Sequence, residues 1–264
     1  MFKLGMPTLI EFDSLEENIH LCKKLGLDFI ELNMNVPIFT PEYISSEELK
    51  KLMIKHKINF TIHLPEELDL TSFQPSIRRG HINRCKEAIL WASSAGINIL
   101  NMHINNGIYF TLPESKYWIN EKYEAEFLTL FLDSYKEILL YADEYNVKVC
   151  LENTGNFFLP FVKKGIELIK EFNGFHLTWD AGHDAKCHFK ETTVFEQLAE
   201  KITHMHLHDF NENGDHQALY TGNVPINERL HFAKKHNLSI VLENKTSEAL
   251  EKSLNNIGIF FNKY

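Results

Sequence analysis

The chain has 264 residues, of which 44% are hydrophobic and 12% aromatic, and this composition supports a large buried core rather than a disordered protein. Its formal net charge of −9, from 36 acidic and 27 basic residues, disfavours broad binding to a nucleic-acid backbone. The four cysteines form no CxxC pair, which argues against a zinc ribbon or a disulfide framework. No signal-peptide pattern and no apolar run of about 18 residues is present, so we expect a cytoplasmic protein without a membrane partner.

Segments of strand character alternate with segments of helical character along the whole chain. Ser14 and Ser45 begin capping patterns at helix starts, and Gly26 and Gly96 mark helix ends. The predicted strands are Lys3–Leu9, Asp28–Asn33, Asn59–Pro65, Ile97–Ile104, Lys148–Thr154, Phe175–Asp180, Ile202–Phe210 and Ser239–Lys245. After a first helix that ends at Gly26, the predicted helices are Ser45–His56, Ser76–Ala95, Lys122–Tyr145, Lys163–Phe172, Thr192–Glu200, Ile226–His236 and Ser247–Phe261.

This alternation predicts the fold class. Each connection between parallel strands must return through a helix, so alternating strands and helices indicate a parallel sheet. Eight such units predict an α/β protein with a single closed (β/α)₈ TIM barrel, formed by one domain over residues 1–264. A doubly wound open sheet is disfavoured, because no glycine-rich phosphate loop follows the first strand.

Three histidines occupy alternate positions of the predicted strand Ile202–Phe210, so that His204, His206 and His208 share one face. A buried imidazole needs partners for its nitrogens, and this face therefore requires carboxylates, water or a metal ion. A half-exposed strand with solvated histidines is the alternative. His208, which precedes Asp209, is expected to orient His206 or the following loop.

Most predicted strands end in a residue that can bind a metal ion or transfer a proton. The C-terminal ends of barrel strands meet at one mouth, where the active sites of such barrels lie. His183 follows Asp180 by three residues, and His216 lies in the loop after the seventh strand. The six strand ends with such residues carry His63, His103, Glu152, Asp180, His206 and Glu243.

Three carboxylates that converge in one mouth repel one another unless a proton or a cation neutralises them. We therefore predict a divalent metal ion bound through three oxygens and one nitrogen, a set that suits Mn, Mg, Co or Zn without choosing among them. The predicted ligands are Glu152, Asp180, His206 and Glu243. Four histidines are expected to bind either further metal ions or the substrate: His63, His103, His183 and His216. For His183 and His216, an ordinary loop histidine is the alternative.

Short motifs follow one another from the third strand to the eighth: TIHLPEELDL, NMHI, LENTG, WDAGHD, HLHD and LEN. This ordered series resembles the xylose isomerase-like barrel superfamily, which contains sugar-phosphate isomerases and epimerases together with endonuclease IV. The resemblance spans nearly the whole chain and places the family's metal-binding Glu-Asp-His-Glu set on the four predicted ligands. In its keto-sugar epimerases the first and last of these, here Glu152 and Glu243, also act as the acid/base pair.

The endonuclease IV branch is the second interpretation. Its trinuclear zinc site uses further ligands, which the resemblance places on His63, His103, His183 and His216. Its Asp-x-His pair appears here as Asp215 followed directly by His216, so that the aspartate is shifted by one residue. Arginines that could grip a bent DNA duplex are also few. An abasic-DNA phosphoesterase therefore ranks below a sugar enzyme.

Our leading hypothesis is a metal-dependent isomerase or epimerase of a small sugar, sugar phosphate or polyol-derived ketone. The metal ion would polarise the carbonyl and stabilise the enediolate oxygen. Glu152 and Glu243, three strands apart, would remove and return the proton. A non-catalytic barrel that binds a sugar or a metal is the third alternative, but nothing in the sequence requires it, because both glutamates of the acid/base pair are present.

Three further features carry open alternatives. The aromatic segment Tyr109–Trp118 is placed to form a lid over a sugar, but packing against a second subunit of a homo-oligomer explains the same residues. Lys245 either meets a substrate carbonyl or phosphate or is a solvated lysine at a strand end. Glu31, in the inward register of the second strand, either touches the substrate or makes a structural polar contact.

Overall fold

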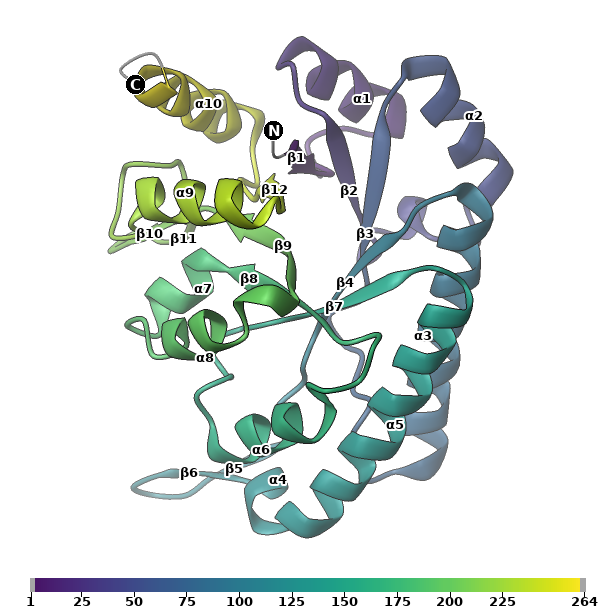
Figure 1. Ribbon diagram of the computed structural model, residues 1–264, viewed down its shortest axis with the longest axis vertical. Helices are drawn as coiled ribbons and strands as arrows, with labels where there is room; N and C mark the ends of the chain where they lie inside the picture. The colour runs from purple at the N-terminus through teal and green to yellow at the C-terminus, as the bar shows by residue number, and fades with distance from the viewer. Residues whose placement is uncertain (1–2, 262–264) are drawn as a thin grey trace.

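The computed structural model describes residues 3–261, and within them eight parallel strands form a closed barrel (Figure 1). The strands are β1 (Lys3–Pro7), β2 (Phe29–Asn33), β3 (Asn59–His63), β4 (Ile99–His103), β7 (Lys148–Glu152), β8 (His176–Asp180), β9 (Ile202–Leu207) and β12 (Ser239–Leu242). They pair in the order β1, β12, β9, β8, β7, β4, β3, β2, and β2 pairs with β1 to close the barrel. The predicted TIM barrel is confirmed.

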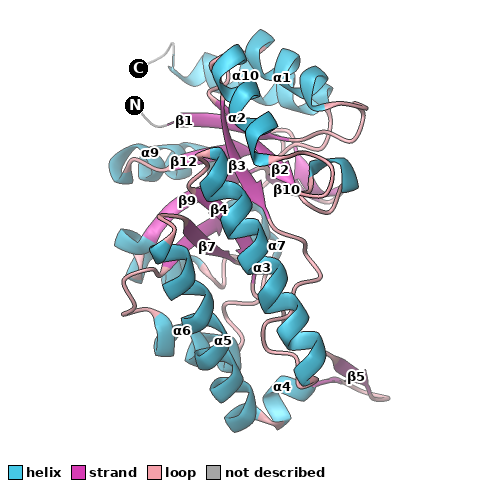
Figure 2. Cartoon of the chain, turned by 90° about the vertical axis from the view of Figure 1, so that its right-hand side faces the viewer, coloured by secondary structure: helices cyan, strands magenta, loops and turns pink. Residues whose placement is uncertain are grey.

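Helices surround the barrel, and the long helices α3 and α5 lie side by side along one flank (Figures 1 and 2). The helices are α1 (Leu15–Lys24), η1 (Pro37–Phe39), α2 (Ser46–His56), α3 (Pro75–Ala95), α4 (Ile119–Lys122), α5 (Glu124–Glu144), α6 (Pro160–Ile169), α7 (Ala181–Lys186), α8 (Thr192–Gln197), η2 (Ala199–Lys201), α9 (Ile226–His236) and α10 (Ser247–Phe261). Within the described residues, every helix falls short of the length and apolarity needed to cross a bilayer.

The predicted capping signals explain where several helices begin and end. Ser14 accepts a hydrogen bond from the backbone of Glu17, whose side chain in turn caps the backbone of Ser14. Ser45 and Glu48 repeat this capping box before α2. Gly96 ends α3 with a φ of 86°, in the left-handed region that glycine adopts without strain. These local signals fix the lengths of the helices that separate the strands.

The barrel wall alternates between polar and apolar residues. On β3, Thr61 reaches inward to the Glu31 carboxylate, whereas the neighbouring Ile62 is fully buried in the apolar core. Successive side chains of a strand point to opposite faces, so one face of each strand packs under the helices and the other lines the interior. Polar side chains at the C-terminal ends of the strands therefore point toward one another.

The loops after β4 and β9 differ from the predicted elements. The aromatic segment forms an antiparallel hairpin of β5 (Tyr109–Thr111) and β6 (Lys116–Trp118), at the end of the molecule opposite α1 and α10 (Figure 2). The strand predicted over Ile202–Phe210 ends at Leu207, and β10 (Asp209–Asn211) then pairs with β11 (Gly214–Gln217) in a separate hairpin. The lid role of the aromatic hairpin stays a prediction.

The Asp209 carboxylate explains why the chain leaves the barrel after β9. It accepts hydrogen bonds from the backbone N–H groups of Phe210, Thr221, Gly222 and Val224, at 2.8 to 3.0 Å. These hydrogen bonds replace the backbone hydrogen bonds to neighbouring barrel strands that a longer β9 would make. They fold the segment after His208 into a compact loop above the barrel.

Candidate metal centre

Four side chains predicted as metal ligands converge around one imidazole nitrogen. His206 Nδ1 lies 3.0 Å from Glu152 Oε1, 3.3 Å from Glu243 Oε2 and 3.9 Å from Asp180 Oδ2. Glu152 and Asp180 are the last residues of β7 and β8, and Glu243 follows β12 directly. All four side chains are buried. One nitrogen and three carboxylate oxygens therefore surround a single point at the barrel mouth.

The surroundings favour the ionised form of the two glutamates. Burial by itself raises the pKa of Glu152, but His206 and His103 outweigh it and hold that pKa well below its usual value. Burial likewise raises the pKa of Glu243, while Lys245 and His206 lower it further than burial raises it. Lys245 Nζ lies 2.7 Å from Glu243 Oε1. Both carboxylates are thus held in the ionised form by neighbouring basic side chains.

This donor set fits a divalent cation. The buried Oε2 of Glu243 makes no hydrogen bond within the described residues, although it faces the same point as His206 Nδ1. Carboxylate oxygens with one imidazole nitrogen are ligands that Mn²⁺, Zn²⁺ and related ions accept. A cation would satisfy the free oxygen and offset the repulsion among the carboxylates.

Two further histidines approach the other oxygen of Glu152. His63 Nε2 lies 3.4 Å and His103 Nε2 lies 3.3 Å from Glu152 Oε2, which also accepts a hydrogen bond from the Asn101 amide. Burial lowers the pKa of His63, but its hydrogen bond to Glu152 and the charge of Glu152 raise the pKa to about 9. His63 Nδ1 faces the Leu64 carbonyl at 2.8 Å, so donation there would leave Nε2 as an acceptor for a cation.

A third group of donors lies outside the barrel, on the helix α7 and on the hairpin strand β11. His183 Nε2 lies 3.7 Å from Asp215 Oδ2, and ligand atoms of His183, Asp215 and His216 all lie within 4.8 Å of one another. Burial lowers the pKa of His216 to about 4 although Glu243 opposes this, so the ring is neutral at neutral pH. The structure thus brings together all eight predicted site residues, and Asp215 joins them despite its shifted position in the sequence.

Two further side chains support the site. Asn153, which the sequence did not single out, accepts the backbone N–H of Asp180 through Oδ1 at 2.7 Å, while its amide donates to Glu191 at 2.7 Å. His208 was expected to orient His206 or the following loop. Its Nε2 lies 3.2 Å from Asp180 Oδ1, and its Nδ1 accepts the backbone N–H of His216 at 3.1 Å, so it contacts Asp180 and the following loop. Gly182 leaves room for the His208 ring, because an added Cβ would overlap it. The alternation of histidines on β9 was the sequence signal for His208; Asn153 offered none.

The sequence model described as the xylose isomerase-like TIM barrel matches residues 19–255, which is most of the chain. The chain belongs to this family. Among its relatives, the uncharacterized protein MJ1614 of Methanocaldococcus jannaschii is 23% identical over 268 residues, covering 97% of this chain and 98% of the relative.

Solved structures share the xylose isomerase-like fold over nearly their whole lengths. A D-tagatose 3-epimerase-like protein superposes with a TM-score of 0.80 at 22% identity, covering 98% of this chain and 97% of its own. The IolI protein, solved with a bound zinc atom, superposes with a TM-score of 0.72 at 18% identity, covering 99% of each chain. At these identities the likeness shows the fold alone.

Proposed function

We propose that this protein is a metal-dependent isomerase or epimerase of a small sugar, sugar phosphate or polyol-derived ketone. The observation that carries the proposal is the placement of two ionised, buried glutamates on either side of His206 Nδ1, at 3.0 Å and 3.3 Å. Glu152 ends β7 and Glu243 follows β12, and β8 and β9 separate these strands in the barrel. The two carboxylates therefore reach the site from different sides.

In this proposal the glutamates exchange one proton with the substrate. One carboxylate removes the proton from the carbon beside the carbonyl, and the bonding electrons move into an enediolate. The other glutamate, which takes up a proton from solvent before this step, donates that proton to the carbon, and the first glutamate then releases its proton to solvent. Lys245 pairs with Glu243 Oε1, which keeps Glu243 available as a base. His183 and His216 orient substrate hydroxyl groups from the loop side. Microscopic reversibility lets the two glutamates exchange roles in the reverse reaction.

A divalent cation held by Glu152, Asp180, His206 and Glu243 would supply Lewis-acid polarisation of the substrate carbonyl. The similar folds support this assignment, because a D-tagatose 3-epimerase-like protein and an L-ribulose 3-epimerase are among them and IolI binds zinc. We therefore assign the substrate to the class of small polyhydroxy ketones and aldehydes.

The test is proton exchange on a panel of keto-sugars and their phosphates. Protein purified without chelator is loaded with Mn²⁺, Co²⁺, Mg²⁺ or Zn²⁺, and NMR in D₂O follows deuterium incorporation beside the carbonyl. We expect exchange and conversion for at least one substrate. Glu243→Gln should abolish turnover while it weakens substrate binding much less, because the amide keeps the shape and loses the basic oxygen.

Glu212→Gln is the matched control, since Glu212 is an exposed glutamate on the turn between β10 and β11. Its activity should equal that of the wild type. Unchanged turnover in Glu243→Gln would remove Glu243 from the acid/base role. Measurable sugar affinity without conversion of any panel member would point to a non-catalytic barrel instead.

A phosphoesterase acting on abasic DNA is the second candidate, favoured by the three neighbouring donor groups. Glu152 lies between His63 and His103 on one side and His206 on the other, and the His183 group adjoins Asp180. Such an arrangement offers places for more than one ion. Elemental mass spectrometry separates the candidates: several zinc ions per chain, with cleavage of an abasic duplex, would favour the phosphoesterase. One ion per chain without cleavage would favour the sugar enzyme.

A further inference from the structure

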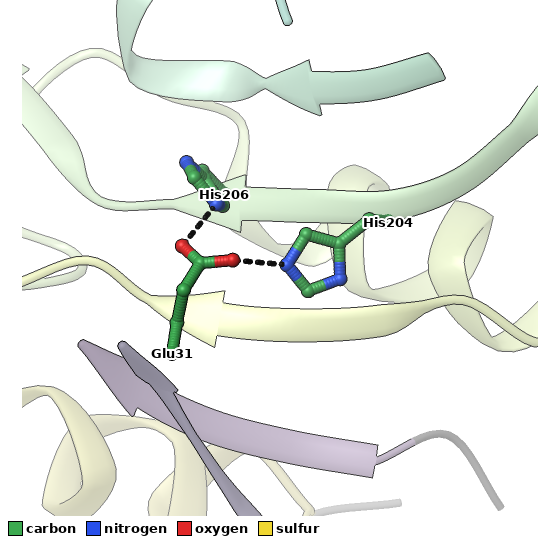
Figure 3. A group of neighbouring side chains, drawn as sticks. All are labelled: Glu31, His204 and His206. Carbon is green, nitrogen blue, oxygen red and sulfur yellow. Dashed lines mark ion pairs between the residues drawn. The ribbon is translucent and has the colours of Figure 1, made fainter. Parts of the chain in front are cut away.

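Below the metal centre, a third buried glutamate lies inside the barrel between two histidines (Figure 3). Glu31, on β2, is 2% exposed. Its Oε1 lies 2.8 Å from His206 Nε2, and its Oε2 lies 3.3 Å from His204 Nε2. Thr61 donates a further hydrogen bond to Oε2 at 3.2 Å. Glu31 therefore contacts His206 on the side of the ring opposite to Glu152 and Glu243.

Both nitrogens of His206 face carboxylates: Nε2 lies 2.8 Å from Glu31 Oε1, and Nδ1 lies 3.0 Å from Glu152 Oε1 and 3.3 Å from Glu243 Oε2. The predicted ligand set converges on the Nδ1 side, where Asp180 Oδ2 also lies at 3.9 Å. A neutral imidazole carries one N–H and one lone pair, and a metal ion takes the lone pair. A cation among these carboxylates would take the Nδ1 lone pair, and the ring would then carry its proton on Nε2, facing Glu31.

We infer that Glu31 is a positioning residue of the metal centre: by accepting the Nε2–H of His206, it fixes the ring and directs the Nδ1 lone pair at the cation. The inference rests on the proposed metal site. Histidine ligands commonly donate their second N–H to a carboxylate, and loss of that partner costs about 10- to 100-fold in metal affinity. This role gives Glu31 a function without substrate contact.

His204 and Ser239 complete the arrangement behind Glu31. His204 Nδ1 lies 2.6 Å from Ser239 Oγ, and its ring packs near Phe29 with centroids 6.0 Å apart. Ser239 Oγ can donate to Nδ1, and His204 would then carry its proton on Nε2, which lies 3.3 Å from Glu31 Oε2. Contacts at both oxygens, with His206 at Oε1 and with His204 and Thr61 at Oε2, limit the rotation of the Glu31 carboxylate.

The experiment compares Glu31→Leu with Glu31→Gln and with the control Glu212→Leu, at an exposed glutamate on the turn between β10 and β11. Leucine removes the acceptor at similar size, whereas glutamine keeps an oxygen that can accept from Nε2. Zn²⁺ and Co²⁺ affinities are measured by competition with a chromophoric chelator. We expect a loss of about 10- to 100-fold for Glu31→Leu, a smaller loss for Glu31→Gln and a change of less than about twofold for Glu212→Leu.

A second readout does not depend on metal. Nitrogen-15 NMR of the metal-free protein detects the proton on His206 Nε2 and its exchange with solvent. We expect a slowly exchanging Nε2–H in the wild type, because Nε2 faces the buried Glu31 carboxylate at 2.8 Å, and faster exchange in Glu31→Leu. If Glu31→Leu fails to fold, Glu31→Gln and the wild-type spectrum still decide the question.

Two results would overturn the inference: a His206 Nε2 that carries no proton in the wild type, or wild-type metal affinity in a folded Glu31→Leu. A second ion bound between Glu31 and the two histidines would give the first of these results. A wild type that binds no divalent metal would defeat the proposed function instead. The Nε2–H signal would in that case show separately whether Glu31 faces a protonated Nε2 of His206.

Discussion

The donors of the barrel mouth fall into two groups that the molecule holds in different ways. The first group lies on the barrel strands: His63, His103, Glu152 and Asp180 are each the last residue of a strand, His206 lies within β9, and Glu243 directly follows β12. The backbone hydrogen bonds of the barrel therefore fix the positions from which these side chains project. His183, Asp215 and His216 lie on α7 and β11, outside the barrel. The sheet provides no register for these residues. Their placement depends on side-chain contacts, which makes the outer group the more sensitive to single substitutions.

Among the side-chain contacts that place the outer donors, those of the Asp209 carboxylate are the strongest. Of the variants considered, Asp209→Asn should therefore lower the stability of the protein most. Oδ1 accepts the N–H groups of Phe210 and Val224, and Oδ2 those of Thr221 and Gly222. An amide NH₂ in place of one oxygen would leave two backbone donors without an acceptor. Each unsatisfied buried donor costs about 1–3 kcal/mol, so we expect a loss of about 2–6 kcal/mol in the free energy of unfolding, measured in urea.

Asp209→Asn should also make the hairpin that carries Asp215 and His216 more mobile, while the donors on the barrel strands stay in place. Limited proteolysis should cut between residues 211 and 223 in Asp209→Asn at concentrations that leave the wild type intact. Glu212→Gln in the same hairpin should resist like the wild type, because Glu212 is exposed. Equal stability and equal protease resistance of Asp209→Asn would show that the hairpin holds itself without the carboxylate.

Gly182→Ala, on the helix α7 that carries His183, should lower stability less than Asp209→Asn does. A Cβ at Gly182 would overlap the His208 ring, which contacts Asp180 and the backbone N–H of His216. Overpacking of this kind costs about 1–3 kcal/mol, and the displaced ring should also shift Asp180. Thermal unfolding and metal affinity measure the two consequences.

Gly80→Ala is the matched control. Gly80 lies on an exposed stretch of α3, and an added Cβ meets nothing within 4 Å. Because alanine is the better helix former, this variant should gain about 0.5–1 kcal/mol. A Gly182→Ala variant as stable as the wild type, with unchanged metal affinity, would mean that α7 shifts without disturbing the site.

The same division explains what the sequence could and could not predict. Glu152 and Asp180 were predictable because alternation along a strand and convergence of parallel strands are rules of the fold. The contact of Glu31 with His206 joins strands across the barrel interior, and strand stagger, which is not visible in one sequence, sets it. The four backbone partners of Asp209 lie up to 15 residues away in an aperiodic loop. No local pattern marks such a network.

Lys186→Ala should have the smallest effect, although it removes an ion pair to a site residue. Lys186 Nζ lies 2.9 Å from Asp215 Oδ2, but the lysine side chain is 57% exposed, and exposed pairs contribute little. Asp215 also lies 3.4 Å from His208 Nδ1. We expect a change below about 0.5 kcal/mol in unfolding free energy. Lys170→Ala, which removes the surface pair with Glu167, is the control and should unfold like the wild type. A larger loss of unfolding free energy in Lys186→Ala, together with weaker metal binding, would contradict this expectation. It would show that a surface charge, and not only the buried contacts of Asp209 and His208, holds the outer donors in place.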